Sequence, residues 1–333
     1  MRGPLAKLLR SCSTWPKPWR RVPAAGQNNC RTAQQGVSQT LSHDHRNPLQ
    51  VSMSDPWRSV RRVLTAAPIA TRPDFGISAV ACRSDHTRWS EPEVRADYRV
   101  VLVRRGRFRR TAAGVPADID ATLAYVGAPG EEESFAHPSG GDHCTAISVA
   151  PELWRSMAGE TAGPAAQTVY VDPQLDLAHR RLLAAARSGD VGYAVSEELL
   201  ALLATAISRT VTGLALIGGA STGHDRSLVA AAREAIAEGH PASGTLFSLA
   251  ELLGVSPYRL SRAFPRELGV SVTRYRHRVR IGRALDRLEA GENSLSVLAA
   301  DLGYADQAHL TRTMRQYLGH TPTALRRLLT PVH

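Results

Sequence analysis

Side chains suited to metal binding or nucleophilic chemistry lie in the middle of this 333-residue chain. The polar candidates there are His86, Trp89, His137, His143 and Cys144. A metal site needs several ligands that converge on one ion, commonly a His-x-His pair with further His or carboxylate ligands. His137 and His143 are six residues apart, which is not ligand spacing on one strand, although a loop could bring them together. We therefore expect ordinary strand and turn residues there, with no catalytic residue, no metal and no cofactor.

Cysteine chemistry is also not indicated. None of the four cysteines, which are Cys12, Cys30, Cys82 and Cys144, belongs to a Cys-x-x-Cys pair. This spacing excludes a zinc ribbon and argues against a disulfide scaffold. Cys144 opens an expected strand, and nothing around it in sequence favours a thiolate, so we expect it in the core.

A different kind of chemistry is indicated near the C-terminal end, where a unit of about 25 residues occurs twice. Leu260-Ser-Arg262-Ala-Phe264 recurs 50 residues later as Leu310-Thr-Arg312-Thr-Met314. Each copy predicts a helix-turn-helix. The expected helices cover 247–253, 257–267, 294–302 and 307–317. Two matching copies favour a nucleic-acid-binding module over a generic helical hairpin.

The turns of both units carry local signals for this arrangement. Gly254 and Gly303 tolerate the positive φ that ends a helix. Ser256 is a good N-cap, and Pro257 suits the first helical position. Asp306 provides the corresponding cap in the second unit. These residues position the second helix of each unit.

The segment between the units, 272–290, predicts one connecting helix. At 1.5 Å per residue it spans ~28 Å, which approaches the ~34 Å between successive major-groove faces on one side of a DNA duplex. Four arginines fall within ~60° of one another on its helical wheel, opposite an apolar face. They are Arg276, Arg280, Arg283 and Arg287, and the apolar face consists of Ile281, Leu285 and Leu288. The stripe either tracks phosphates or is a solvated helix face.

A longer motif extends the second unit, namely Gly303-Tyr-Ala-Asp-Gln-Ala-His-Leu-Thr-Arg312 followed by Leu318-Gly-His-Thr-Pro322. With this motif, residues 225–329 resemble the AraC/XylS family of bacterial transcription regulators. The resemblance implies double-stranded DNA as the partner, one recognition helix per unit, binding as a monomer or homodimer, and activation or repression of genes. RNA polymerase is a further partner it allows. It also implies a cytoplasmic, nucleoid-associated protein, and a cupin-like domain that binds an effector of unknown identity or dimerises.

The resemblance implies which side chains of the recognition helices face DNA. They are Tyr258, Arg259, Ser261 and Arg262 in the first helix, and Gln307, Ala308, His309, Thr311 and Arg312 in the second. Arg262 is the best base reader because its fork matches two acceptors of guanine. Tyr258 suits a thymine methyl or a phosphate, Gln307 suits adenine, and His309 and Arg312 suit bases or phosphates. Ala308 offers only an apolar contact, so the second helix is expected to read fewer bases.

Pro265 departs from the family pattern because it lies inside the first recognition helix. It removes the N–H that would bond the Ser261 carbonyl, at a cost of about 3 kcal/mol in a helix interior. Since it follows the base-reading turns, we expect a kink or an early end of the helix without loss of docking. The position of Arg266 then stays undefined.

The middle of the chain predicts strands followed by helices. Strand-like runs cover 77–82, 98–104, 107–111, 122–126, 132–136 and 144–149, with a hairpin at Arg105-Gly106. Two helices follow over 176–188 and 195–210, and the second places Val195, Leu199 and Leu202 on one face. A glycine-rich stretch from 213 then indicates a linker. The strands indicate a small sandwich or barrel.

Charge is concentrated at the two ends of the chain. Residues 1–52, 53–224 and 225–333 carry net charges of +7, −1 and +5. A basic C-terminal domain beside a neutral one favours a polyanion-binding module. Residues 1–52 lack apolar periodicity, so we expect a disordered or spurious extension ahead of a functional chain that begins at Met53. A non-specific DNA-binding arm is the alternative.

The expected architecture is therefore an α+β multidomain chain without a membrane-spanning segment. An effector-binding or dimerisation β-barrel with two following helices covers 53–212, and a linker covers 213–224. An all-α domain with two helix-turn-helix units joined by a long helix covers 225–333. The expected function is that of a sequence-specific DNA-binding regulator and not an enzyme. Two alternatives stay open: a barrel enzyme with a helical appendage, and a regulator whose N-terminal domain only dimerises.

Overall fold

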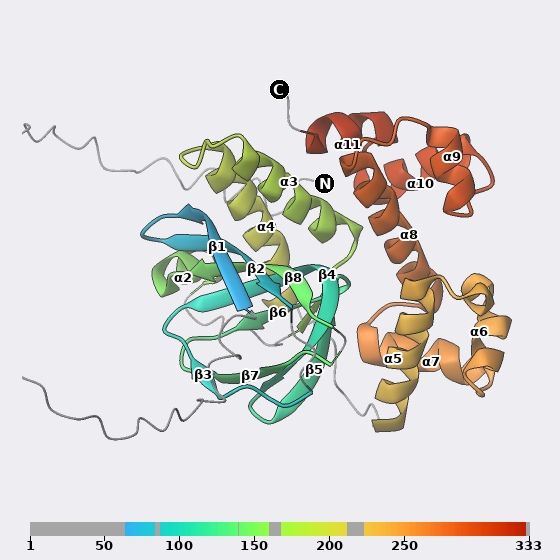
Figure 1. The fold of residues 1–333 in the computed structure, drawn as a ribbon, viewed down its shortest axis with the longest axis horizontal. Coiled ribbons are helices and arrows are strands. Elements are labelled where there is room, and N and C mark those ends of the chain that lie inside the picture. Colours follow the sequence, from blue (N-terminus) through green and yellow to red (C-terminus); the bar gives the residue numbers. More distant parts are fainter. Residues whose placement is uncertain (1–63, 84–86, 139, 160–167, 212–222, 331–333) are drawn as a thin grey trace, which may run out of the picture. The chain divides into compact units, whose positions relative to one another are not determined.

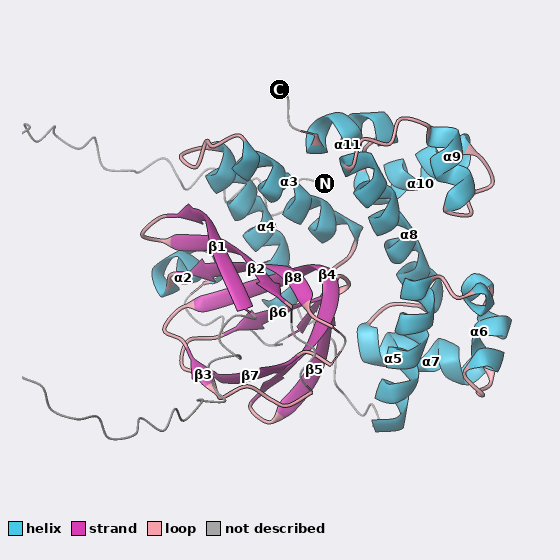
Figure 2. Cartoon of the chain, viewed as in Figure 1, coloured by secondary structure: helices cyan, strands magenta, loops and turns pink. Residues whose placement is uncertain are grey.

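A computed structural model describes residues 64–83, 87–138, 140–159, 168–211 and 223–330 (Figure 1). His86, the expected extension 1–52 and most of the expected linker lie outside these residues. The described part belongs to one compact unit that runs from Asp55 to His333. Its N-terminal half is a sheet with helices, and its C-terminal part is all helical (Figure 2). The expected α+β class with an all-helical C-terminal part is confirmed.

Nine antiparallel strands form the N-terminal sheet among the described residues. They are β1 Leu64–Thr71, β2 Phe75–Cys82, β3 Glu93–Val94, β4 Tyr98–Ala112, β5 Val115–Asp120, β6 Leu123–Gly127, β7 Glu132–Ala136, β8 Asp142–Val149 and β9 Thr168–Tyr170. The order is β1-β2-β8-β4-β5-β6-β9, with β7 joining β4 to β3. The long strand β4 pairs with β8 and β6 in its first half and with β5 and β7 in its second. It is therefore shared by the two halves of the sheet.

The hairpin expected at Arg105-Gly106 is wrong, because β4 continues through it. Gly106 has a φ of 77°, and the ladder between β4 and β8 shifts register beside it, which makes this position a β-bulge. A Cβ on Gly106 would lie 2.3 Å from the carbonyl oxygen of Gly141, so only glycine fits. The chain reverses later, at Ala113 and Gly114, where both φ values are positive as a two-residue hairpin loop requires.

The helices extend the expected pattern. They are α2 Pro151–Ala158, α3 Pro173–Arg187, α4 Ala194–Val211, α5 Gly223–Glu238, the short 3-10 helix η3 Pro241–Gly244, α6 Leu246–Leu252, α7 Pro257–Leu268, α8 Val272–Glu289, α9 Leu295–Asp301, α10 Gln307–Leu318 and α11 Pro322–Leu329. Seven of these were expected within about three residues of their observed ends, a normal uncertainty for helix boundaries. None of the described helices is long and apolar enough to cross a membrane.

The N-terminal core lies between the sheet and helices α2, α3 and α4. Val195, Leu199 and Leu202 of α4 are fully buried there, which confirms the face expected from their spacing. Trp154 of α2 is also fully buried and stacks on Tyr98 with ring centroids 4.4 Å apart. The helices thereby close one side of the sheet.

Candidate nucleic-acid interface

Each helix-turn-helix unit is built from the same local signals, as the repeat predicts. The Ser256 hydroxyl accepts from the backbone N–H of Arg259 at 3.2 Å, and the Asp306 carboxylate accepts from that of His309 at 2.6 Å. Gly254 has a φ of 64°, in the left-handed region, where a glycine can end a helix without steric strain because it has no Cβ. These caps fix where α7 and α10 begin.

Apolar burial decides which face of α7 and α10 points outward. Leu260 and Phe264 of α7 are fully buried in the first unit, and Leu310 and Met314 of α10 are fully buried in the second. Figure 1 shows α8 passing between the α5–α7 group and the α9–α11 group. With the inner stripe of each helix packed on its own unit, the opposite stripe of each is free to contact a partner.

The first recognition helix, α7, exposes most of its expected contact residues. Tyr258 has 72% of its surface exposed, and Arg259 and Arg262 are exposed beside it. The Arg262 guanidinium lies 5.8 Å from the centre of the Tyr258 ring. Ser261 is half-buried and its hydroxyl donates to the Tyr258 carbonyl at 2.9 Å. Three of the four side chains therefore lie on an outward surface.

The second recognition helix, α10, is divided in the same way. Gln307, Ala308 and Arg312 are exposed, whereas Thr311 is half-buried. The half-buried His309 is used by the fold, because its ring Nδ1 accepts from the backbone N–H of Ala305 at 3.3 Å. The outward surface of α10 is therefore less basic at its start than that of α7.

Three exposed side chains extend these surfaces beyond the residues expected from the sequence. They are Arg266 on α7 and Arg315 and Gln316 on α10. Their spacing of three or four from Arg262 and Arg312 was the signal that could have identified them. Arg266 has a defined position, with its guanidinium 3.9 Å from Asp225.

An early end of α7 at Pro265 is wrong, because the helix continues to Leu268 and is closed by Gly269 with a φ of 68°. Pro265 is exposed, so its ring lies on the solvent side of the helix. The Ser261 carbonyl that loses its helical partner can be hydrated there, which reduces the penalty for this proline.

The connecting helix α8 has the expected length and apolar face, but three arginines of the expected stripe bind the protein itself, and the fourth, Arg276, is half-buried. Its 18 residues span ~27 Å at 1.5 Å per residue. The Nε–H of Arg280 donates to the Leu302 carbonyl at 2.9 Å, and its guanidinium stacks on Tyr304 at 4.0 Å. Arg283 donates to the Ala237 carbonyl, and Arg287 pairs with two acidic side chains. Phosphate contact by Arg280 stays a prediction, and these bonds do not favour it.

Both helix-turn-helix units share their cores with the N-terminal half. Leu123 of β6 and Tyr170 of β9 are buried in the core of the first unit. Leu177 of α3 is buried in the core of the second. Burying these side chains removes apolar surface from water on both partners, so the N-terminal half supports both recognition helices.

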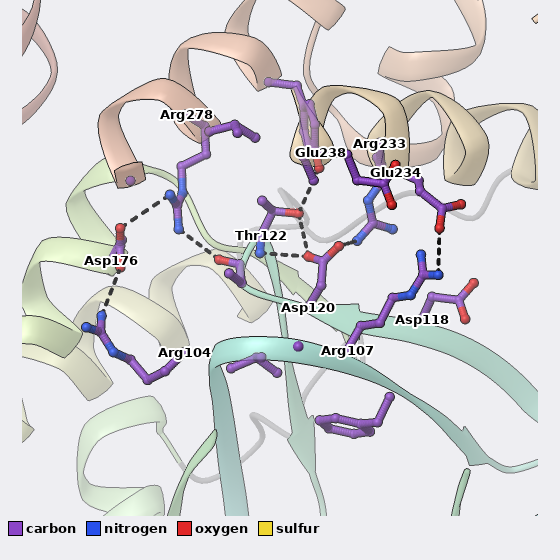
Figure 3. Close-up of a pocket in the computed structure, with 18 of the residues that line it drawn as sticks. Arg104, Arg107, Asp118, Asp120, Thr122, Asp176, Arg233, Glu234, Glu238 and Arg278 are labelled. Carbon is purple, nitrogen blue, oxygen red and sulfur yellow. Dashed lines mark hydrogen bonds and ion pairs between the residues drawn. The ribbon is translucent and has the colours of Figure 1, made fainter. Parts of the chain in front are cut away.

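A pocket of about 870 Å³ lies where the sheet meets α3, α5 and α8 (Figure 3). Its wall is highly charged, and several of these charges form ion pairs. Arg107 of β4 contacts Glu234 of α5 at 2.7 Å, and Arg233 of α5 pairs with Asp120 of β5. A polar ligand entering this pocket would compete with ion pairs between the two halves.

Ion pairs beside this pocket join α3 and β4 to α8. Glu289 accepts from Arg104 at 2.9 Å and from Arg180 at 2.8 Å. Burial alone would raise the pKa of Asp176, but Arg278, Arg180 and Arg104 surround it and lower that pKa to about 2. Asp176 is therefore a permanent anion at neutral pH, and it holds cations from both halves.

The polar candidates of the middle segment are arranged differently from the expected spacing. His143 is exposed, whereas His137 is buried next to Asp142, with His137 Nδ1 2.8 Å from Asp142 Oδ1. Cys144 is buried in the sheet, and this burial raises the pKa of its thiol, as expected for a core cysteine. Trp89 is 42% exposed and lies beside Arg109.

Comparison with known proteins identifies relatives of the C-terminal part. A family model described as a helix-turn-helix domain matches residues 249–328. The arabinose operon regulatory proteins of Salmonella typhimurium and Escherichia coli are each 30% identical to this chain over 79 residues, which is 24% of the chain. The matched part spans only 28% and 27% of their own lengths.

Among solved structures, the C-terminal domain of AraT, a response regulator from Geobacillus stearothermophilus, is 31% identical, with a TM-score of 0.30. That alignment covers 32% of this chain and 88% of the AraT domain. ToxT from Vibrio cholerae with a bound unsaturated fatty acid aligns over 79% of this chain and 98% of its own, at 11% identity and a TM-score of 0.34. A TM-score of this size does not establish a shared fold.

Proposed function

We propose that this chain is a sequence-specific DNA-binding transcriptional regulator, with a helix-turn-helix domain of the AraC type at residues 249–328. One observation carries the proposal. Two capped helices, α7 and α10, each bury one face in their own unit and present arginine and other polar side chains on the opposite face. The rigid helix α8 joins them at a length suited to successive major grooves.

In this proposal, the exposed arginines of the two helices provide most of the reading. Arg262 and Arg312 occupy equivalent positions, and each can form a bidentate contact with guanine. Tyr258 and Gln307 add contacts to thymine and adenine, and Arg259 contacts phosphate. Ser261, His309 and Thr311 contribute less, because all three are half-buried.

We further propose that a small molecule modulates DNA binding through the N-terminal half, with domain limits of 53–212, 213–224 and 225–333. The shared cores and the ion pairs of Glu289 support this coupling, because a change in the sheet reaches α8 through bonded contacts. Residence in the cytoplasm, a homodimer and contact with RNA polymerase complete the proposal, and these rest on the family alone.

Selection of binding sites from random duplex DNA, followed by sequencing, tests the proposal. Two enriched blocks about one helical turn apart are expected when both helices read the major groove. A single enriched block would mean that only one of the two helices reads bases. Absence of enrichment by the full chain at low salt would refute sequence-specific binding.

The Arg262→Ala variant tests the role of a single side chain. We expect a loss of about 1–3 kcal/mol on the selected site and relaxed specificity at one base pair, since a bidentate guanine contact is removed. Arg155→Ala is the matched control, because Arg155 is an exposed arginine on α2, far in sequence from both units. Equal losses on selected and random DNA would contradict base reading by Arg262.

A further inference from the structure

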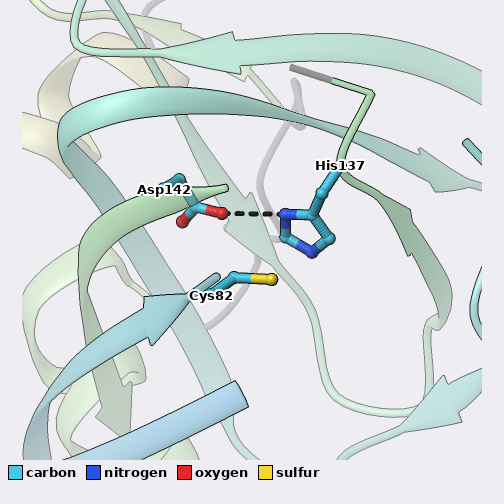
Figure 4. Close-up of side chains that lie close together, drawn as sticks. All are labelled: Cys82, His137 and Asp142. Carbon is cyan, nitrogen blue, oxygen red and sulfur yellow. Dashed lines mark ion pairs between the residues drawn. The ribbon is translucent and has the colours of Figure 1, made fainter. Parts of the chain in front are cut away.

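Three side chains with metal-binding atoms meet at one end of the N-terminal sheet (Figure 4). Cys82 ends β2 and Asp142 begins β8, and the two are direct partners in the antiparallel ladder. His137 follows β7 and turns its ring toward them. One ligand atom from each residue lies within 4.8 Å of the other two. We propose that Cys82, His137 and Asp142 bind a divalent cation of the zinc class.

The dimensions of the cluster suit such an ion. Zinc bonds of about 2.0–2.3 Å in a tetrahedron place neighbouring ligand atoms about 3.3–3.8 Å apart. His137 Nδ1 and Asp142 Oδ1 are 2.8 Å apart, and no pair of ligand atoms exceeds 4.8 Å. Shifts of about 1 Å or less in the side chains, without movement of the strands, would therefore bring the three groups onto one ion.

The ligand types select the class of metal. Magnesium and calcium prefer oxygen ligands alone, whereas thiolate and imidazole favour zinc and its neighbours among the transition metals. The three residues have exposed fractions of 5%, 8% and 3%, in the order Cys82, His137, Asp142. A buried carboxylate beside a thiol is costly unless a cation or a proton compensates the charge, and a bound metal would supply that compensation.

The cluster also has an entrance. A surface pocket of about 260 Å³ is lined by Cys82 and Asp142, together with Gly106, Gly141 and His143. Three protein ligands leave one position of a tetrahedral ion open, and this pocket provides room there for water or a donor atom of a small ligand.

The site would bear on the contacts that hold the C-terminal helices. Asp142 pairs with Gly106 at the bulge of β4. Arg104 and Arg107, on either side of that bulge, contact Glu289 of α8 and Glu234 of α5. An ion that fixes Asp142 thus fixes the strand from which both arginines project. This regulatory consequence rests on the proposed function, whereas the metal site itself does not.

Titration of the purified full chain with Co²⁺ tests the site directly. We expect one equivalent to bind with a thiolate-to-cobalt charge-transfer absorption, which requires cysteine ligation and needs no variant. Binding of Co²⁺ should release a proton from the thiol, and Zn²⁺ should then displace the cobalt and abolish the absorption. Binding without the charge-transfer band, or no binding, would overturn the proposal.

Variants then identify the ligands. Cys82→Ser, His137→Gln and Asp142→Asn should each weaken Zn²⁺ binding by more than about tenfold. Changing a residue that only orients a metal ligand already costs about tenfold or more in affinity, so loss of a ligand should cost at least as much. His224→Gln and His240→Gln are the controls, because both histidines are exposed and lie outside the cluster, and they should bind normally. Thermal unfolding without metal shows which variants are folded. Unchanged affinity in folded Cys82→Ser, or equal losses in the controls, would refute the assignment.

The regulatory consequence has a separate readout. DNA affinity of the wild-type chain, measured with Zn²⁺ and with a chelator, should differ, and the Cys82→Ser chain should show no difference. Equal DNA affinities in the wild type would refute the coupling, while the cobalt spectrum judges the site independently. Loss of all DNA binding under both conditions would contradict the proposed function and leave the metal site standing.

Discussion

The ion pair between Arg104 and Glu289 is predicted to couple the two halves of the chain more strongly than an exposed pair in the same interface. The two charged groups are 2.9 Å apart, and their side chains are 22% and 17% exposed. At that distance Coulomb's law gives about 1.4 kcal/mol in water and about 6 kcal/mol at an effective dielectric constant of 20. Desolvation offsets part of the larger figure, so we expect a net coupling energy of about 1–3 kcal/mol.

A double-mutant cycle measures this coupling. Urea unfolding of the wild type, Arg104→Gln, Glu289→Gln and the double variant gives the pairwise term, even though Glu289 also contacts Arg180. Arg107 and Glu234 provide the matched control, since they are 2.7 Å apart with side chains 44% and 43% exposed. Their coupling should stay below about 1 kcal/mol. A coupling energy at Arg104–Glu289 no larger than in the control cycle would refute the reasoning.

Three further predictions concern single side chains. Arg280→Met should destabilise the fold by about 1–2 kcal/mol, because it removes a donor to the Leu302 carbonyl. The salt dependence of DNA binding should not change. If the slope of log affinity against log salt concentration fell by about one, Arg280 would contact a phosphate after all. Burial, followed by nearby Arg104's charge, lowers the pKa of His179 from 6.5 to about 3, so the folded chain binds fewer protons than the unfolded chain between those values. Stability should therefore fall by about 2 kcal/mol between pH 7 and pH 5, and unfolding of His179→Gln should show a flatter profile; identical profiles would contradict this. Gly106→Ala should lower the free energy of unfolding by more than about 1 kcal/mol, because φ at this position is positive and the new Cβ would lie 2.3 Å from a carbonyl oxygen. An unchanged unfolding temperature would contradict the bulge at this position.

The helix-turn-helix units could be predicted almost completely because their signals are local. Ser256 and Asp306 cap the helices that they were expected to cap, and Gly254 ends α6 as expected. Caps and positive-φ glycines act within one turn of the backbone, so their effect is readable from neighbours in sequence. Of the kink or early end expected at Pro265, the early end is wrong for a tertiary reason, since burial of the opposite helix face places this proline toward solvent.

The sheet shows where local signals mislead. A glycine after a charged residue in Arg105-Gly106 is typical of a hairpin, yet β4 passes through it as a bulge. The choice depended on Gly141, which leaves no room for a Cβ at this position. A contact between segments 35 residues apart carries no signal in either segment alone.

The sequence by itself determined the two repeated units, their caps, the connecting helix and the outward position of Arg262 and Arg312. Only the tertiary structure brought Cys82 and Asp142 into register and turned His137 toward them. It also gave Arg104 of β4 and Arg280 of α8 their partners within the protein. The physical reason is the separation along the chain over which each interaction acts. Helix periodicity and capping are set by bonds within a few residues, whereas strand register and ion pairing are set by which distant segments the core brings together.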